Sequence, residues 1–182
     1  MLLTLDGHAL AFADALRGPV YDVLFGGITW LGSLWLLIPL TLICAVVLLS
    51  RGYRSESAML ILSLGGAALL TNLCKWIFAR RRPDLYWPVV DMPVSSSFPS
   101  AHTAQATAFF LCLFVVIRRI APDWAMLTAV ISVAAVLTVA LSRIYLQLHF
   151  PSDVLGGLVL GALWVLLSDR VVGKSVGPGG PG

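Results

Sequence analysis

Charged side chains are scarce in this sequence. Asp, Glu, Lys and Arg make up 12% of its 182 residues, whereas an ordinary soluble domain is about 25% charged. Hydrophobic residues account for 59% of the chain. This balance excludes an ordinary soluble globular domain and predicts an integral membrane protein, with the lipid bilayer as a partner. The net charge of +3 is too small, in a chain this apolar, to indicate a nucleic-acid partner.

Cysteine is also rare, and its spacing indicates no chemistry. Cys44, Cys74 and Cys112 lie in or at the ends of apolar runs and form no CxxC pair. Free cysteine is among the most buried residue types. The placement therefore favours small buried hydrophobes over a disulfide or a metal site.

The first 20 residues lack the basic start of a signal peptide, and Asp6, His8, Asp14 and Arg17 interrupt their apolar positions. The pattern predicts a short helix over residues 1–20 that lies in the membrane interface. A surface helix packed on the rest of the protein is the alternative. The other end of the chain, residues 171–182, is rich in Gly and Pro and is expected to be disordered.

Five segments contain no Asp, Glu, Lys or Arg. They are residues 23–50, 57–74, 101–117, 124–142 and 154–168. A membrane-spanning helix needs about 20 apolar residues, with a range of about 17 to 25. The last segment reaches this length if its helix begins near Pro151. The sequence therefore predicts an all-α, polytopic membrane helix bundle of about five transmembrane helices, with residues 21–170 forming a single domain.

Basic residues give a tie between the two sides of the membrane, with six on each. The tie breaks if Lys75, Arg82 and Arg143 serve a site rather than orientation. The positive-inside rule then places the short connections 51–56 and 118–123 and the C-terminus in the cytoplasm. The polar stretches 75–100 and 142–153 would face outward.

The first polar stretch on this side is KWIFARRRP, which places Lys75 and Arg82 two helical turns apart. They share one face if the helix continues until Pro83 stops it. Lysine provides a compact charge and arginine a planar fork that suits phosphate oxygens. A basic belt that anchors the helix end is the alternative.

The second stretch, SSSFPSAHT at residues 95–103, places Ser100 and His102 where the third span begins. The free N–H groups of a helix start and its dipole favour an anion. A serine hydroxyl adds a donor, and a histidine titrates near neutral pH. The alternative is a serine N-cap beside an interfacial histidine.

The third stretch is SRIYLQLHFPSD at residues 142–153, which contains Arg143, His149 and Asp153. Asp153 follows His149 by four residues, in the first turn of the last span. Such a carboxylate can accept a hydrogen bond from one imidazole nitrogen and leave the other free to react. The alternatives are a helix cap for Asp153 and a snorkelling charge for Arg143.

Together the three stretches describe a phosphate pocket with an acid and a nucleophile. Two of the chain's three histidines lie in them. No group of carboxylates accompanies them to hold Mg²⁺. We therefore expect no metal and no cofactor, and we expect positive side chains to stabilise the developing charge.

The order and spacing of these residues resemble the three-part signature of the type 2 phosphatidic acid phosphatases, also called the lipid phosphate phosphatase superfamily. The matching motifs are Lys75-x6-Arg82-Pro83, Pro99-Ser100-Ala101-His102 and Ser142-Arg143-x5-His149-x3-Asp153. The resemblance implies that His149 forms a phosphohistidine, that Asp153 orients it, and that His102 is the acid and then the base. It also implies a metal-free site whose phosphate ligands are Lys75, Arg82, Ser100, Ala101 and Arg143.

Ala101 departs from the family pattern, which has glycine at this position. A left-handed alanine would be strained by about 1–2 kcal/mol. We therefore expect Ala101 to be helical, so that its backbone N–H stays available to phosphate.

The resemblance implies a metal-independent membrane lipid phosphatase. An outward-facing site in so small a chain favours undecaprenyl diphosphate as the substrate and a bacterial cytoplasmic (inner) membrane as the location. Phosphatidylglycerol phosphate, phosphatidic acid and lipid A are alternatives, as are a lipid phosphotransferase and a non-catalytic lipid-binding relative. The sequence gives no oligomeric state.

Overall fold

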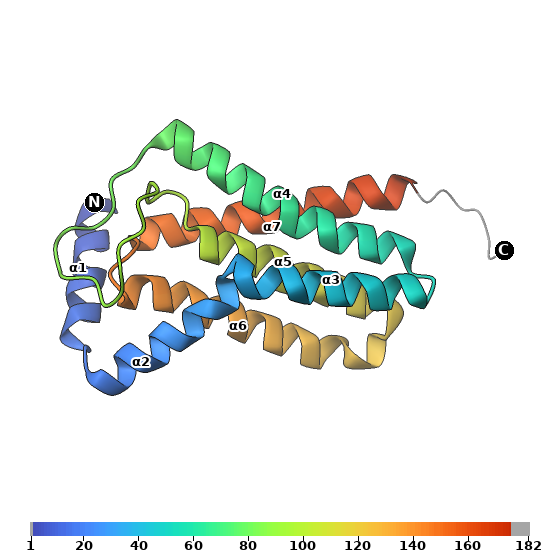
Figure 1. The fold of residues 1–182 in the computed structure, drawn as a ribbon, viewed down its shortest axis with the longest axis horizontal. Helices are drawn as coiled ribbons and strands as arrows, with labels where there is room; N and C mark the ends of the chain where they lie inside the picture. Colours follow the sequence, from blue (N-terminus) through green and yellow to red (C-terminus); the bar gives the residue numbers. More distant parts are fainter. Residues whose placement is uncertain (1, 176–182) are drawn as a thin grey trace.

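The computed structural model describes residues 2–175, and over that range the chain is helical, with no strand (Figure 1). Helices α3 to α7 run side by side, and α1 lies across one end of them. The predicted all-α membrane bundle is confirmed. The elements are α1 (Leu2–Ala15), α2 (Pro19–Ile28), η1 (Thr29–Gly32), α3 (Leu34–Ser50), α4 (Arg54–Phe78), α5 (Ala101–Ile120), η2 (Pro122–Trp124), α6 (Ala125–Tyr145) and α7 (Pro151–Ser175).

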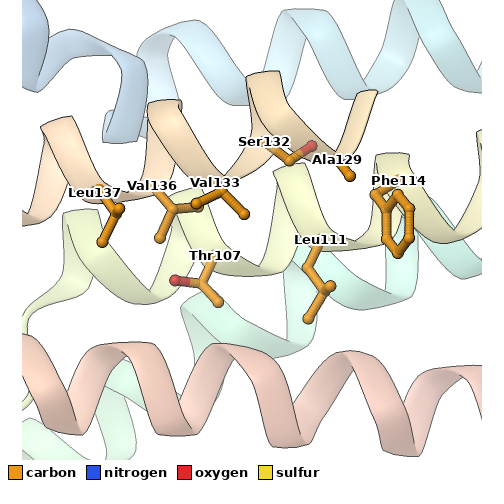
Figure 2. A pocket seen from close by; sticks show the side chains of 8 residues that line it. All are labelled: Thr107, Leu111, Phe114, Ala129, Ser132, Val133, Val136 and Leu137. Carbon is orange, nitrogen blue, oxygen red and sulfur yellow. The ribbon is translucent and has the colours of Figure 1, made fainter. Parts of the chain in front are cut away.

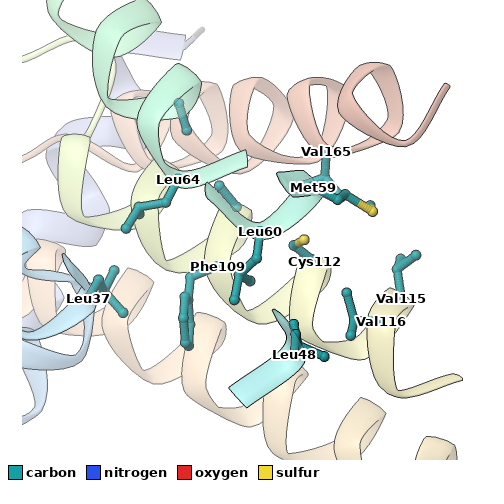
Figure 3. Close-up of a cluster of buried hydrophobic side chains, with 12 residues drawn as sticks. Leu37, Leu48, Met59, Leu60, Leu64, Phe109, Cys112, Val115, Val116 and Val165 are labelled. Carbon is teal, nitrogen blue, oxygen red and sulfur yellow. The ribbon is translucent and has the colours of Figure 1, made fainter. Parts of the chain in front are cut away.

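Helix α5 is central, because it packs against α3, α4, α6 and α7. Small residues on it allow close approach: Ala104, Ala106 and Ala108 are fully buried. Between membrane helices this packing, rather than a hydrophobic driving force, provides the stability. The main apolar cluster joins four helices (Figure 3) and consists of Leu37, Leu48, Met59, Leu60, Leu64, Ala67, Ala108, Phe109, Cys112, Val115, Val116 and Val165.

Gly157 and Gly161 bring α7 into contact with α5. A Cβ added at Gly157 would lie 2.7 Å from the Ser100 carbonyl oxygen, and one at Gly161 would lie 2.6 Å from that of Ala104. This small-xxx-small pair therefore packs within the chain. It holds the first turn of α7, which carries Asp153, against the start of α5.

Four helices are long and apolar enough to cross a membrane: α4, α5, α6 with η2, and α7. The segments Pro19–Gly32 and Leu34–Ser50 together form a fifth candidate span, with a bend of 44° between them. The sequence predicts a span within residues 23–50, and the structure divides this segment among α2, η1 and α3. Ser33 leaves the helical conformation and caps α3, its Oγ accepting from Trp35 N at 3.3 Å. Gly32, at the break, packs on the backbone of His102, where a Cβ would lie 2.7 Å from the carbonyl oxygen.

An apolar groove of about 270 Å³ lies between α5 and α6 (Figure 2). Its two hydroxyl groups are engaged with the backbone, since Thr107 donates to Thr103 O and Ser132 donates to Phe110 O. The groove therefore offers packing surface rather than reactive groups. The lining residues are Thr107, Leu111, Phe114, Ala129, Ser132, Val133, Val136 and Leu137.

The helix predicted over residues 1–20 is shorter in the structure, because α1 ends at Ala15 and α2 begins at Pro19. Helix α1 packs on α6 and α7. Leu10 and Ala13 are buried in this contact, while Leu5 and Phe12 are exposed. Its place in the membrane interface stays a prediction. The disordered tail predicted for residues 171–182 is wrong at its start, because α7 continues to Ser175; the remainder lies outside the described residues.

Candidate active site

The three polar stretches of the sequence meet at the end of the bundle that α1 crosses (Figure 1). His149 lies in the short connection between α6 and α7 and is 1% exposed. The backbone N–H groups of Leu148 and His149 both donate to the Arg143 carbonyl oxygen, at 3.2 and 3.3 Å. Gln147 permits this tight turn by adopting φ +61°. The last turn of α6 therefore fixes where His149 lies.

Asp153 lies beside one nitrogen of this imidazole. Its Oδ2 is 3.5 Å from His149 Nδ1 and accepts hydrogen bonds from Phe150 N, at 2.9 Å, and from the Ser97 hydroxyl. The carboxylate is fully buried. It favours the tautomer with the proton on Nδ1, which leaves the lone pair on Nε2.

The protonation state of His149 suits a nucleophile. Burial lowers the pKa of His149 to about 3, although the hydrogen bond to Asp153 acts in the opposite direction. At neutral pH the imidazole is therefore uncharged, and Nε2 can attack an electrophile without first losing a proton.

Arg82 approaches this free nitrogen. Its Nη1 donates to Leu148 O at 2.8 Å and lies 3.2 Å from His149 Nε2, while its Nε donates to Ser95 O at 2.8 Å. Burial lowers the pKa of the Arg82 guanidinium, with the Asp153 charge opposing the effect, but arginine stays protonated at neutral pH. A positive fork therefore lies where a phosphate bonded to Nε2 would need its oxygens neutralised.

The route by which Arg82 reaches the site differs from the prediction. Helix α4 does not continue to Pro83; it ends at Phe78, because Ala79 adopts a left-handed conformation with φ +44° and its N–H bonds to Lys75 O. Residues after Ala79 run across the end of the bundle. Lys75 and Arg82 therefore converge through a turn of the backbone and not through a shared helix face.

Lys75 belongs to the same cluster and is 6% exposed. Its ammonium group donates to Ser96 O. It lies close enough to Arg82, Arg143 and Asp153 to interact with each electrostatically. A buried ammonium group in this position can turn toward an incoming anion.

Arg143 is 3% exposed, and its Nη1 donates to Thr29 Oγ1 at 2.6 Å. Its buried Nε has no hydrogen-bond partner among the described residues. A buried, unsatisfied charged donor is costly, so this nitrogen is suited to bind an anion. Thr29 lies in η1, and the break in the first span therefore sets the direction of Arg143.

The start of α5 contributes the remaining candidates. Ser100 N donates to Asp153 O at 3.0 Å, and Ser100 Oγ accepts from Thr103 at 3.0 Å. Ala101 is the first helical residue, so the expectation that it is not left-handed is confirmed. His102 is half-buried and lies near His149 and the cations of the cluster.

Four residues that the sequence did not predict take part in the site. Ser97 and Arg80 bond to Asp153, Asp6 bonds to Arg80, and Thr29 accepts from Arg143. Arg80 was not among the predicted site residues, but its Nη1 lies 2.5 Å from Asp153 Oδ1. The one sequence signal for Asp6 is that a carboxylate interrupts the apolar residues of α1.

Cations dominate the cluster. In the part of the chain that the structure describes, no three His, Cys, Asp or Glu side chains group together as metal ligands would. Lys75, Arg82 and Arg143 instead surround an uncharged, oriented imidazole beside a helix N-terminus. This arrangement can bind a tetrahedral anion and attack its central atom.

The fold and the site together define a membrane helix bundle in which cationic side chains surround a buried, oriented histidine at one end. The chain belongs to the PAP2 superfamily, whose profile matches residues 57–176. It is accordingly a lipid phosphatase of the PAP2 type.

Its relatives carry several different names. It is 33% identical over 159 residues to phosphatidylglycerophosphatase B of Bacillus subtilis, covering 85% of this chain and 77% of that protein. It is 28% identical over 151 residues to an undecaprenyl-diphosphatase of Sulfolobus acidocaldarius, covering 81% of this chain and 68% of that protein. The crystal structure of a transmembrane PAP2-type phosphatidylglycerolphosphate phosphatase from Bacillus subtilis superimposes with a TM-score of 0.87 at 28% identity, covering 97% of this chain and 88% of that one.

Proposed function

We propose that the chain hydrolyses a lipid phosphate or diphosphate through a phosphohistidine on His149, without a metal. The observation that carries this proposal is that each imidazole nitrogen of His149 faces a different charged side chain. Nδ1 faces the Asp153 carboxylate at 3.5 Å, and Nε2 faces the Arg82 guanidinium at 3.2 Å. One nitrogen is oriented and the other lies in a field that attracts phosphate.

In the first step Nε2 attacks the terminal phosphorus, the N–P bond forms and the P–O bond to the leaving group breaks. The electron pair leaves with that oxygen, which belongs to the lipid alcohol of a monophosphate or to the lipid phosphate of a diphosphate, and His102 donates a proton to it. In the second step His102 removes a proton from water, and the resulting hydroxide displaces His149 and releases phosphate. Lys75, Arg82 and Arg143 neutralise the equatorial oxygens in both steps, and the N-terminus of α5 at Ser100 and Ala101 adds backbone donors.

For the physiological substrate we propose undecaprenyl diphosphate. The Sulfolobus acidocaldarius relative supports this choice by its name, and the Bacillus subtilis relatives support phosphatidylglycerol phosphate equally. Phosphatidic acid and lipid A remain in the same class of substrate. A lipid phosphotransferase would use the same phosphohistidine but would need a second lipid for turnover.

We further propose that the site faces outward from a bacterial cytoplasmic (inner) membrane. The ion pairs of Arg80 with Asp6 and Asp153 support this orientation, because a paired arginine no longer counts among the basic residues that decide the membrane topology. A single cysteine at the exposed Val94, near the site, should then react with an impermeant maleimide in intact cells. A cysteine at Arg51, at the opposite end, should react only after lysis; the reverse pattern would invert the orientation.

The activity is tested by phosphate release from purified protein in detergent with excess EDTA. The four substrates are undecaprenyl diphosphate, phosphatidylglycerol phosphate, phosphatidic acid and lipid A, and the blank is His149→Gln. Release that survives EDTA and disappears in the variant supports the proposal, and the lipid with the highest kcat/KM identifies the substrate. Release that needs a divalent cation, or that persists in His149→Gln, contradicts it.

A further inference from the structure

We infer that Arg80 is a positioning residue for the reaction, held in place by Asp6 of the N-terminal helix, so that α1 forms part of the catalytic framework. This inference rests on the proposed role of His149. Arg80 lies outside the motif residues Lys75 and Arg82, and Asp6 lies outside residues 57–176, which match the family.

The contacts of Arg80 connect two buried carboxylates. Its Nη1 lies 2.5 Å from Asp153 Oδ1, and its Nη2 lies 3.0 Å from Asp6 Oδ2. Asp153 is fully buried and Asp6 is 3% exposed. A buried carboxylate is costly unless it is paired, and this guanidinium is the cation that contacts both of them among the described residues.

The pairing with Arg80 occupies the oxygen of Asp153 that does not face His149. Oδ2 accepts from Ser97 and Phe150 N and faces Nδ1 of the imidazole, whereas Oδ1 faces the guanidinium. The carboxylate is thereby fixed from both sides. Because the orientation of His149 depends on Asp153, a change at Arg80 reaches the nucleophile through one intermediate residue.

Asp6 also fixes the start of α7. Its Oδ1 accepts from the Ser152 N–H at 3.0 Å and its Oδ2 accepts from the Ser152 hydroxyl at 2.6 Å. The same Ser152 hydroxyl accepts from Arg80 Nη1 at 2.8 Å. Asp6 thus serves as a helix cap supplied by another helix, one residue before Asp153.

Helix α1 makes a further contact on the other side of the nucleophile. Gln147 Nε2 donates to the Leu10 carbonyl oxygen at 2.9 Å, and both residues are fully buried. Residues 147 and 152, which flank His149, are therefore both bonded to α1. The Arg80 guanidinium also lies over the Phe150 ring, 4.4 Å from its centre. The segment that carries the nucleophile is held along its length.

The first experiment measures turnover of undecaprenyl diphosphate in detergent micelles by Arg80→Ala. At metal sites, partners that orient a ligand contribute about 10- to 100-fold, and by analogy we expect a loss in kcat of that size with little change in KM. The Arg80 side chain is 27% exposed, so the space that it vacates is open to small solutes. Methylguanidinium in the buffer should then restore kcat in a saturable manner, and urea, its uncharged counterpart, should not.

Arg81→Ala is the matched control, because Arg81 is exposed and precedes the motif residue Arg82; it should show normal turnover and no response to methylguanidinium. Arg80→Lys should fall between wild type and Arg80→Ala. Normal kcat in Arg80→Ala, or a loss that urea restores as well as methylguanidinium, would overturn the inference.

A double-variant cycle tests the part played by α1 and remains informative if Arg80→Ala does not fold. Asp6→Asn keeps the size of the side chain and removes its charge. We expect it to lower kcat by itself and to add little in the Arg80→Lys background, because both changes act on the same carboxylate. Additive losses in kcat would show that Asp6 of α1 affects turnover by a route other than Asp153. If His149→Gln retains turnover, the proposed function fails; if only the Arg80 and Asp6 results fail, it stands.

Discussion

Arg143→Lys tests whether the planar fork, and not the positive charge alone, is required at the site. Arginine here uses Nη1 for Thr29 and keeps its buried Nε without a partner among the described residues. A lysine has one nitrogen and cannot bond to Thr29 and to phosphate in the same geometry. The variant should therefore lose at least one charge-assisted hydrogen bond to the substrate.

The size of the loss follows from that bond. A hydrogen bond to a charged group contributes about 1.5–3 kcal/mol, which corresponds to about a 10- to 150-fold loss in kcat/KM. The measurement is steady-state phosphate release with the preferred lipid in detergent, and Arg51→Lys, exposed at the far end of α3, is the control. A kcat/KM equal to that of the wild type would reduce Arg143 to an anchor of the helix end.

Thr29→Val provides the companion measurement, because it is nearly isosteric and removes only the acceptor for Arg143 Nη1. We expect a smaller loss in kcat/KM than for Arg143→Lys. The double variant should be little worse than Arg143→Lys, since Thr29 is expected to act through Arg143. Fully additive losses would show that Thr29 affects turnover by another route.

Three further predictions concern Asp153, the α5–α7 contact and acid stability. Asp153→Asn should lower kcat by about 10⁴, as the equivalent change does in a Ser-His-Asp triad, and near-normal turnover in the folded variant would refute its role. Gly161→Ala should destabilise by about 1–3 kcal/mol because its Cβ would lie 2.6 Å from a carbonyl oxygen, whereas Gly65→Ala meets nothing within 4 Å; equal melting temperatures would contradict the packing. The pKa of His149 is about 3 in the fold, below its ordinary 6.5. Between these two pH values the unfolded chain therefore binds a proton that the folded chain does not. The free energy of unfolding should therefore fall by up to about 1.4 kcal/mol for each unit by which the pH decreases. The decrease should be less steep in His149→Gln. An identical pH dependence in that variant would argue against a buried neutral imidazole.

The local part of the site could be predicted from the sequence because it depends on short spacings. His149 and Asp153 are four residues apart, and Pro151 begins the helix that brings them together. The apolar segments likewise indicate the spans, since length and composition decide whether a helix can cross a bilayer.

The remaining contacts depend on pairings between distant residues, which no local pattern encodes. Thr29 and Arg143 are 114 positions apart, and Asp6 and Arg80 are 74 apart. Their meeting requires two irregular backbone features, the break after Gly32 and the left-handed turn at Ala79. Alanine at a left-handed position is rare, so the sequence favoured the wrong alternative, a helix continuing to Pro83.

Trapping the covalent phosphoenzyme tests the nucleophilic role of His149 directly. Protein mixed with lipid labelled in its phosphate with ³²P is quenched in alkali within the first turnover, digested and mapped. A phosphohistidine on His149 predicts label that is stable in alkali and labile in acid, on the peptide that contains His149, and no label in His149→Gln. Turnover without a labelled intermediate, or label on another residue, would exclude His149 as the nucleophile.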